Sequence, residues 1–407
     1  MAWSIVVAAI TIRVSKEEAL CLLRQFVDDT FGASTFNHAR ATQGLVKKVT
    51  RGVIGPEAIS SDKSKFSQSE IILGFQVDMV TVTLRPKDRA IDKIFYLFFS
   101  IDFSKPLPLE TWQCVASIAQ FYSPGMRGMK AYVAPFHAMT KQCGSGKNAR
   151  RGASASALFA VEIWRATSIL LSTDINALSV PLDSFLLGPM SPCDYEVISD
   201  ASPWRLAAAV RDPLTQRILA WSTLKLPFKE GNEGKAQTQR EYLGHLFSIL
   251  LLVAFYRINA TRPAPLSFRW INDITGALAW AQTHKRSSKA SQHACMAVSI
   301  LTMLTDIDIM DAVHIPGVDM GEIDAMSRME IHPDITKVCP SLTPDLYMAV
   351  DNQAVMDLMI LCDPANSYIA ARDHHSALVD MHIFISHIIS SKHERNLPTP
   401  LNIAQYL

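Results

Sequence analysis

Four acidic residues in the middle of the chain are placed where their carboxylates could act together. Asp200 and Asp273 each end an apolar run of the kind that forms a buried strand. Glu241 and Asp324 stand near the starts of two helical patterns. Because parallel strands expose their carboxyl ends at one edge of a sheet, acids at those ends can converge although they are distant in sequence. We therefore expect these four side chains to meet at one edge of a folded sheet.

The chemistry that such a meeting allows depends on metal ions. Carboxylates that converge without basic partners raise one another's pKa, and divalent cations relieve the repulsion. Hard oxygen ligands favour Mg²⁺ or Mn²⁺. Two such ions, about 3.5 to 4 Å apart, activate a water and stabilise the leaving oxygen when a phosphodiester is cleaved in line. The pattern thus predicts two-metal phosphodiester hydrolysis, with the alternative that each acid is only a turn former or a helix N-cap.

The elements around these acids follow one another in an informative order. Apolar runs, helical stripes and turn residues predict three strands, a long helix, a strand, two helices, a strand and a final helix. The long helix has the apolar stripe of a helix packed on a sheet. This order is typical of a mixed α/β domain. The predicted ranges are 195–199, 206–210, 218–221, 237–257, 266–271, 275–282, 291–304, a strand ending at His314 and a helix after Gly321.

The rest of the chain differs in composition from this central part. Its first part mixes a helical pattern at 16–24 with strand-like runs at 71–77 and 80–84, which predicts α+β structure. The small, polar and basic segment 141–157 is typical of an exposed linker, and a helix is expected at 156–171. The length of 407 residues suggests two or three domains. The predicted regions are 1–140, a linker and helix at 141–190, the mixed α/β domain at 191–330, and a helical tail of unassigned role at 331–407.

The charge balance excludes nucleic-acid binding by bulk basicity. Lys and Arg total 39 against 38 Asp and Glu, so any polyanion site must be local. The strongest local cluster follows Asp273 by one helix and combines cations with hydroxyls that can hold a phosphate backbone. A solvated surface is the alternative for this cluster. Its members are Lys285, Arg286, Ser287, Ser288 and Lys289.

The cysteines and the N-terminal segment bear on the compartment. Seven cysteines are scattered without a CxxC spacing, which fits reduced thiols inside a cell. The apolar run at 5–12 lacks a basic start and is too short to span a bilayer. We therefore expect an intracellular protein, cytoplasmic or nuclear, that is neither secreted nor bound to a membrane. Nothing in the sequence bears on its oligomeric state.

The blocks that carry the four acids resemble, in order, the RNase H domain of long-terminal-repeat and DIRS-type retrotransposon polyproteins. The resemblance covers residues 199 to 328 and is most specific in its last part, HIPG followed by DAMSR. Two positions depart from the family pattern, because Ile274 and Met320 stand where the family has asparagine. The blocks are SDAS at 199–202, RE at 240–241, NDITGALAW at 272–280, HIPG at 314–317 and DAMSR at 324–328.

This resemblance implies an RNase H-like fold and a hydrolase that cleaves the RNA strand of an RNA/DNA hybrid. Asp200, Glu241, Asp273 and Asp324 would be its catalytic residues and the ligands of two Mg²⁺ or Mn²⁺ ions, with Arg328 among the nucleic-acid contacts. A hybrid is expected because the family reads helical shape and 2′-hydroxyls. Two alternatives stay open. One is a catalytically inactive, nucleic-acid-binding relic, which Ile274 and Met320 favour, and the weaker one is an integrase-like transferase on the same scaffold.

The first part of the chain resembles the reverse transcriptase of the same polyproteins. FVDD at 26–29, with Asp28 and Asp29, resembles the family's YxDD box, and KSKF at 63–66, with Lys63, resembles the segment behind it. LGF at 73–75 resembles the primer-gripping hairpin, and the segments PGMR at 124–127 and YVAP at 132–135 resemble the thumb. The resemblance implies a partial palm, thumb and connection before the RNase H-like domain. Nucleotide addition needs a third, upstream carboxylate, so we do not expect this chain alone to polymerise DNA.

Overall fold

A computed structural model gives the fold, and it describes residues 21–26, 29–34, 39–58, 67–143, 149–182, 193–226, 237–259, 266–283, 289–305, 307–328, 337 and 339–350. The chain forms two compact units, one of residues 1–87 with 181–186 and one of residues 88–180 with 187–407. Both units contain helices and strands, so the fold class is mixed, as the sequence predicts. The domain limits expected at 140, 190 and 330 remain predictions.

Within the described residues, the first unit begins with a strand pair where the sequence suggested a helix. β1 (Cys21–Phe26) pairs antiparallel with β2 (Asp29–Ser34), and Phe26 lies opposite Asp29. The helix expected over 16–24 is therefore wrong for residues 21–24. A short apolar run fits either period, and pairing with the neighbouring strand decided between them. The helix α2 (Ala39–Ile54) and the 3₁₀ turn η1 (Pro56–Ala58) follow.

The first unit also contains a small four-stranded sheet. Its strands are β3 (Ser69–Ile72), β4 (Phe75–Asp78), β5 (Thr83–Pro86) and β8 (Val180–Pro181), hydrogen-bonded in the order β3-β4-β5-β8. Leu73 and Gly74 both have positive φ, 50° and 87°, the backbone of a tight two-residue hairpin turn. This turn interrupts the strand expected at 71–77, and the turn at 79–82 replaces the start of the strand expected at 80–84.

The second unit opens with a helical part. The Phe98 ring stacks on Trp164 with 5.2 Å between centroids, and both side chains are fully buried. Phe136 and Trp112 are buried in the same part of the core. The elements are α3 (Asp88–Ser100), β6 (Leu107–Pro108), α4 (Leu109–Tyr122), η2 (Ser123–Gly125), η3 (Met129–Tyr132), α5 (Ala134–Gln142), β7 (Arg150–Arg151) and α6 (Ala155–Thr173).

The helix α6 confirms the one expected at 156–171 and is unusually apolar. Within the described residues it is the one helix long and apolar enough to cross a membrane by length and composition, and half of that stretch is buried inside the unit. Ser154 caps its first turn by accepting a hydrogen bond from the Ala157 amide at 3.2 Å. α6 packs on α3 and α5, which is how the core helix of a folded unit behaves.

The remainder of the second unit is built on a five-stranded sheet. All the strands and helices expected between 195 and 328 are present. The order in the sheet is β11-β10-β9-β12-β13, in which β9, β10 and β11 are antiparallel neighbours and β12 is parallel to both β9 and β13. The elements are β9 (Tyr195–Ala201), β10 (Arg205–Arg211), β11 (Ile218–Lys225), α8 (Gln237–Asn259), β12 (Leu266–Asn272), α9 (Thr275–Thr283), α10 (Lys289–Thr305), β13 (Ile307–His314), η4 (Gly317–Asp319), α11 (Glu322–Arg328) and η5 (Pro344–Leu346).

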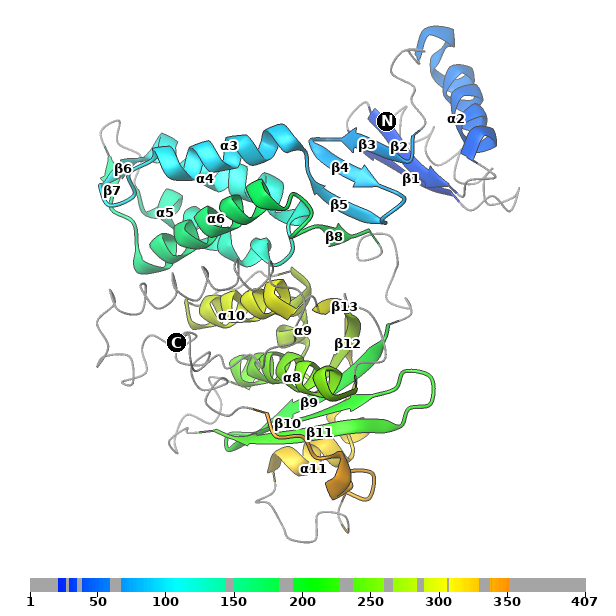
Figure 1. The fold of residues 1–407 in the computed structure, drawn as a ribbon, viewed down its shortest axis with the longest axis vertical. Coiled ribbons are helices and arrows are strands. Elements are labelled where there is room, and N and C mark those ends of the chain that lie inside the picture. Colours follow the sequence, from blue (N-terminus) through cyan, green and yellow to red (C-terminus); the bar gives the residue numbers. More distant parts are fainter. Residues whose placement is uncertain are drawn as a thin grey trace. The chain divides into compact units, whose positions relative to one another are not determined.

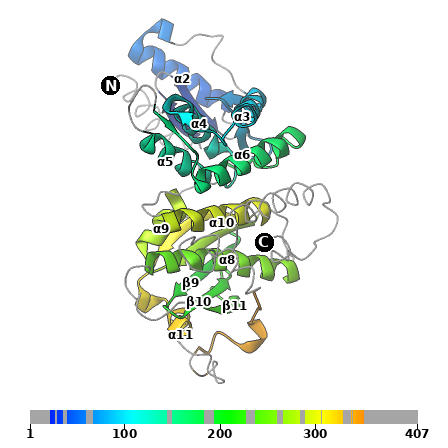
Figure 2. The same ribbon diagram turned by 90° about the vertical axis from the view of Figure 1, so that its left-hand side faces the viewer.

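Both faces of this sheet are covered. α8 and α10 lie side by side, and α8 contacts β9 and β10 (Figures 1 and 2). On the opposite face α11 contacts β9 and β10 and, with residues 339–342, closes a second apolar cluster. Met320 is 3% exposed and belongs to this cluster. The position where the resembled family has asparagine is therefore a core position in this chain.

The helical part and the sheet of the second unit touch through α10. The Tyr132 hydroxyl donates a hydrogen bond to the Met296 carbonyl at 2.7 Å. Gly128 has a φ of +74°, and a Cβ built there would lie 2.5 Å from Met303 Cγ and 2.7 Å from the Ser299 carbonyl oxygen. Glycine is required at this point both for its backbone conformation and for the close approach of the helix.

Candidate metal centre

Three of the four predicted acids converge in the structure. One carboxylate oxygen from each of Asp200, Glu241 and Asp273 lies within 4.8 Å of the other two. Asp200 and Glu241 are buried, with 3% and 1% of their surface exposed, and Asp273 is partly buried. We call this set the acidic triad.

The sheet topology explains why residues so distant in sequence meet. β9 and β12 are parallel, with Ile198 paired with Ile271 near their carboxyl ends. Asp200 is the sixth residue of β9 and Asp273 follows the last residue of β12, so both emerge at the same edge. Glu241, in the first turns of α8, reaches that edge because α8 packs on β9.

Glu241 is held by two neutral amides. Gln237, one helical turn earlier, donates from Nε2 to Glu241 Oε1 at 2.5 Å and to the Ala201 carbonyl at 2.6 Å. Asn272, fully buried at the end of β12, donates from Nδ2 to Glu241 Oε2 at 3.0 Å. These contacts fix the carboxylate without neutralising its charge.

Asp200 is held from the other face of the sheet. The Ser327 hydroxyl on α11 donates a hydrogen bond to Asp200 Oδ2. The Ser202 hydroxyl in turn donates to the Ser327 carbonyl at 2.5 Å. A chain of two serines therefore links α11, the end of β9 and the carboxylate of Asp200.

The carboxylate of Asp273 gives the strongest indication that a cation binds at the triad. Its Oδ1 atom is buried, yet no group in the described part of the chain donates a hydrogen bond to it. A buried anionic oxygen without a donor is costly unless a cation or water satisfies it. Gly317 lies close, because a Cβ there would stand 3.1 Å from Asp273 Oδ2, and His314 Nε2 lies 2.9 Å from the Asp273 carbonyl. The donor set, three oxygen ligands with one unsatisfied, fits a hard divalent ion.

The raised pKa values of the three acids also favour a bound cation. Burial, reinforced by the charge of Asp200, raises the pKa of Glu241 to about 8. Burial raises the pKa of Asp200 to about 6, and the charges of Asp273 and Asp324 add to the effect while the Ser327 hydrogen bond opposes it. Burial also raises the pKa of Asp273. The triad therefore resists full ionisation on its own, which a bound cation reverses.

Another buried acid of the same sheet shows the contrast. Glu196 is 5% exposed and pairs with Arg211 at 2.6 Å and Arg269 at 2.8 Å. In the described residues no Lys or Arg forms such an ion pair with the triad. Cationic side chains thus pair with the structural acid, whereas the three acids at the carboxyl edge have no such ion pair within the described residues and could bind a metal ion.

Asp324, the fourth predicted ligand, lies at the rim of the triad and not in it. Its carboxylate pairs with Arg328 at 2.5 Å, and the two side chains are 27% and 67% exposed. It is near enough that its charge raises the pKa of Asp200 and of Asp273. Its role as a metal ligand remains a prediction.

Several other predicted contacts lie beyond what the structure describes. Lys285, Arg286, Ser287 and Ser288, and in the first unit Asp28 and Lys63, are outside the described residues. The backbones of Lys289, which begins α10, and of Asp29, which begins β2, are described. Of the helical tail expected at 331–407, residues 337 and 339–350 alone are described.

The sequence reasoning missed the polar residues that hold the triad. Gln237 stands four residues before Glu241, the spacing that brings two side chains together on one helix face. Asn272 directly precedes Asp273, and its Oδ1 accepts the Ile274 amide at 2.9 Å. Helix spacing could have indicated Gln237, whereas Asn272 and Ser327 became visible only when strands and helices were assembled.

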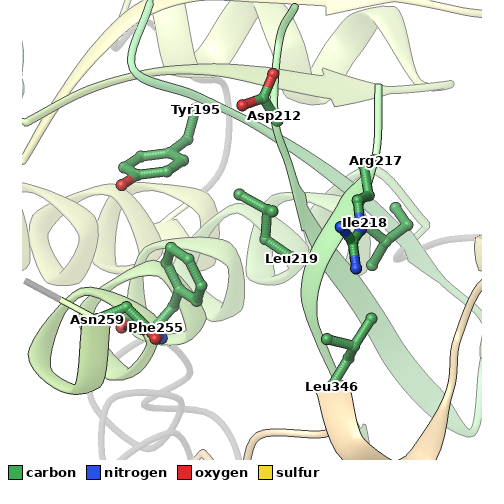
Figure 3. A pocket seen from close by; sticks show the side chains of 8 residues that line it. All are labelled: Tyr195, Asp212, Arg217, Ile218, Leu219, Phe255, Asn259 and Leu346. Carbon is green, nitrogen blue, oxygen red and sulfur yellow. Dashed lines mark hydrogen bonds between the residues drawn. The ribbon is translucent and has the colours of Figure 1, made fainter. Parts of the chain in front are cut away.

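A separate cavity of about 420 Å³ lies at the opposite edge of the same sheet. Figure 3 shows the rings of Tyr195 and Phe255 on one side of it and Leu346 at another. Tyr195 begins β9, and Ile218, also in the lining, begins β11. The cavity is therefore separated from the acidic triad by the length of the strands.

Comparison with known proteins gives distant structural neighbours alone. No family model and no curated protein matches the chain. One neighbour is a foamy viral protease-reverse transcriptase in complex with double-stranded DNA, with a TM-score of 0.32, 14% identity, and coverage of 72% of this chain and 55% of that chain. A second is the same kind of protein in complex with an RNA/DNA hybrid, with a TM-score of 0.33, 13% identity, and coverage of 75% and 37%. A further complex with double-stranded DNA has a TM-score of 0.32, 12% identity, and coverage of 72% and 46%. The chain thus spans between 37% and 55% of the length of these structures.

Proposed function

We propose that residues 191–330, within the second unit, form a retroelement-derived, RNase H-like nuclease that hydrolyses the RNA strand of RNA/DNA hybrids with the help of divalent metal ions. The observation that carries this proposal is the convergence of Asp200, Glu241 and Asp273 within 4.8 Å at the carboxyl edge of the sheet. The sequence blocks around these acids support the same class of enzyme.

The triad would hold Mg²⁺ or Mn²⁺ through its carboxylate oxygens. A divalent ion bound there supplies positive charge to the oxygens of a phosphodiester and lowers its barrier to hydrolysis. The unsatisfied Oδ1 of Asp273 and the raised pKa values of Glu241 and Asp200 fit an ion in this position. Two ions, as the sequence resemblance implies, are part of the proposal, with Asp324 as a ligand at the rim.

The chain's own residues have distinct tasks in this proposal. Gln237 and Asn272 orient Glu241, and Ser327 orients Asp200, so that these two carboxylates keep their places before any ligand arrives. Preorganisation of this kind avoids rearrangement during the reaction. Arg328 is 67% exposed beside Asp324 and can meet a phosphate of the nucleic acid.

The substrate is proposed from chemistry and from the resemblance together. A hybrid offers 2′-hydroxyls on one strand, which distinguish RNA from DNA at a given site. We do not assign nucleotide addition to the first unit, because that reaction needs a third carboxylate beside Asp28 and Asp29, and Asp28 lies outside the described residues.

The deciding experiment incubates the purified full chain with Mg²⁺ and an RNA/DNA hybrid labelled on its RNA strand. Wild type should release short RNA products, and Asp273→Asn should not. Asp345→Asn, which changes an exposed acid in η5, is the matched control and should cleave like wild type. Duplex DNA and duplex RNA, tested in parallel, should remain intact.

The same assay distinguishes the nuclease from the alternative of a catalytically inactive, nucleic-acid-binding relic. Binding of the hybrid by wild type without cleavage above the Asp273→Asn background would contradict the nuclease proposal and favour a nucleic-acid-binding relic. Cleavage of every duplex alike would retain the nuclease and reject the hybrid as its specific substrate.

A further inference from the structure

The turn between β9 and β10 presents an exposed tryptophan at the same edge of the sheet as the acidic triad. Trp204 is 47% exposed, whereas Trp112, Trp164, Trp221 and Trp270 are all buried. The remaining tryptophan of the described residues, Trp280, is half-buried with its ring 5.8 Å from that of Tyr242.

The exposure of Trp204 does not come from a loose turn. The Ser202 hydroxyl accepts hydrogen bonds from the amides of Trp204 at 3.2 Å and Arg205 at 3.1 Å. The Trp204 carbonyl accepts a hydrogen bond from the Leu226 amide at 2.6 Å. The same Ser202 hydroxyl binds the Ser327 carbonyl, so the turn that carries Trp204 is tied to the helix that holds Asp200.

Trp204 lies within reach of a ligand held at the triad. It follows Asp200 by four residues, and an extended chain advances at most about 3.6 Å per residue, so their Cα atoms are at most about 14 Å apart. Base pairs rise by about 3.4 Å along a duplex. The ring can therefore meet a nucleotide between one and about four steps from a phosphate at the carboxylates.

Two exposed cations lie on elements that are bonded to this turn. Lys225, at the end of β11, is exposed and stands opposite Arg205 in the sheet register. Leu226, the next residue, donates its amide to the Trp204 carbonyl, so the end of β11 lies beside the turn that carries Trp204, and Lys225 is one residue from that backbone contact. Arg328 is 67% exposed on α11. Proteins hold nucleic-acid strands by stacking on exposed rings and by phosphate neutralisation, so the exposed ring and these cations favour a polyanion as the occupant.

We propose that Trp204 and Lys225 form a nucleotide-binding rim for the nucleic acid that the triad cleaves. The indole face packs on the flat apolar face of a nucleotide near the scissile phosphate, and Lys225 neutralises a phosphate of the same strand. This proposal takes its occupant from the proposed nuclease function. It adds two positioning residues that make contact outside the metal centre.

Binding is measured in the Asp273→Asn background with Mg²⁺, so that no substrate is consumed, on a labelled blunt hybrid and a labelled single-stranded RNA. Trp204→Ala should weaken binding about tenfold, and Trp204→Phe should keep most of the affinity because it retains a flat ring. Leu214→Ala is the matched control, since Leu214 is 90% exposed in the turn at the other end of β10. A Trp204 effect confined to the single strand assigns the contact to an unpaired base, and an effect on both ligands assigns it to the sugar face of a nucleotide.

Salt dependence separates the two residues. Lys225→Ala should lower the slope of log K against log salt concentration by about 1, and Trp204→Ala should leave that slope unchanged. Unchanged thermal unfolding of both variants shows that folding is intact.

The rim is rejected if Trp204→Ala binds both nucleic acids as well as Leu214→Ala does, or if Trp204→Phe loses as much affinity as Trp204→Ala. The proposed nuclease function is tested separately, by measuring cleavage with the chain in which Asp273 is intact. If the chain binds through Trp204 but does not cleave, the nucleotide-binding rim is supported and the proposed nuclease function is rejected.

Discussion

Asn272 Nδ2 donates hydrogen bonds both to Glu241 Oε2 at 3.0 Å and to the Ser199 carbonyl at 2.9 Å. One buried amide thus connects the end of β12, the backbone of β9 and the first turns of α8. The three elements that carry the acidic triad are held together by a side chain that is not itself acidic.

Replacement of this amide should therefore damage both stability and metal binding. Asn272→Ala leaves Glu241 Oε2 and the Ser199 carbonyl without their donor, which costs about 1–3 kcal/mol of unfolding free energy and about 10- to 100-fold in metal affinity. Urea unfolding and titration with Mn²⁺ measure the two effects. Asn176→Ala, at an exposed position, should stay within about 0.5 kcal/mol of wild type. Equal stability of the two variants would show that the Asn272 bonds contribute nothing.

Without metal, the free energy of unfolding should fall as the pH rises. Acids that are paired with cations have the opposite effect. The folded-state pKa of Glu241, about 8, lies above its ordinary value of 4.5, so the folded state binds the extra proton between these two values. Stability therefore falls as pH rises from about 5 to about 8, with a slope of at most about 1.4 kcal/mol per pH unit for one group. Urea unfolding in EDTA at several pH values measures it. Glu241→Gln should flatten the curve, and a curve that rises through this window would contradict the burial of an unpaired carboxyl.

Metal binding should release protons from the same groups. Glu241 carries a proton below about pH 8, and Asp200 carries one below about pH 6. Because a metal ion binds the ionised carboxylates, its binding should release these protons. Calorimetric titration with Mg²⁺ at pH 6.5, repeated in buffers of different ionisation enthalpy, should report proton release to the buffer. Affinity should rise between pH 6 and 8, and Mg²⁺ should raise the Tm of wild type but not of Asp273→Asn. Identical heats in all buffers would argue against ionisation of Glu241 on binding.

The close contact at Gly128 should be sensitive to a single methyl group. Gly128→Ala places a Cβ 2.5 Å from Met303 Cγ at a φ of +74°, and such overpacking with backbone strain costs about 1–3 kcal/mol. Gly152→Ala is the matched control, because nothing lies within 4 Å of a Cβ there. Denaturant unfolding compares the two, and a neutral Gly128→Ala would show that α10 does not pack on this segment as tightly as described.

The sequence was sufficient to predict the sheet region of the second unit because its signals are local and mutually consistent. Long apolar runs with turn residues between them predicted β9 to β13, and the apolar stripe of 237–257 predicted α8. It failed at 21–24, where a run of a few apolar residues fits a helix or a strand equally well and the pairing partner β2 decides. The apolar pattern also missed the turn at Leu73 and Gly74, since positive φ at a leucine has no reliable signature in sequence, although the resemblance of LGF at 73–75 to a hairpin had indicated a turn there.

The amino-acid sequence by itself determined which acids stand at strand ends and helix starts, because periodicity and turn chemistry act over a few residues. Only the tertiary structure decided that Asp200, Glu241 and Asp273 meet while Asp324 pairs with Arg328. It also decided that Met320 is core and that Trp204 is exposed. These outcomes depend on the register of parallel strands and on the packing of α11 against the sheet, which bring together residues from distant parts of the chain.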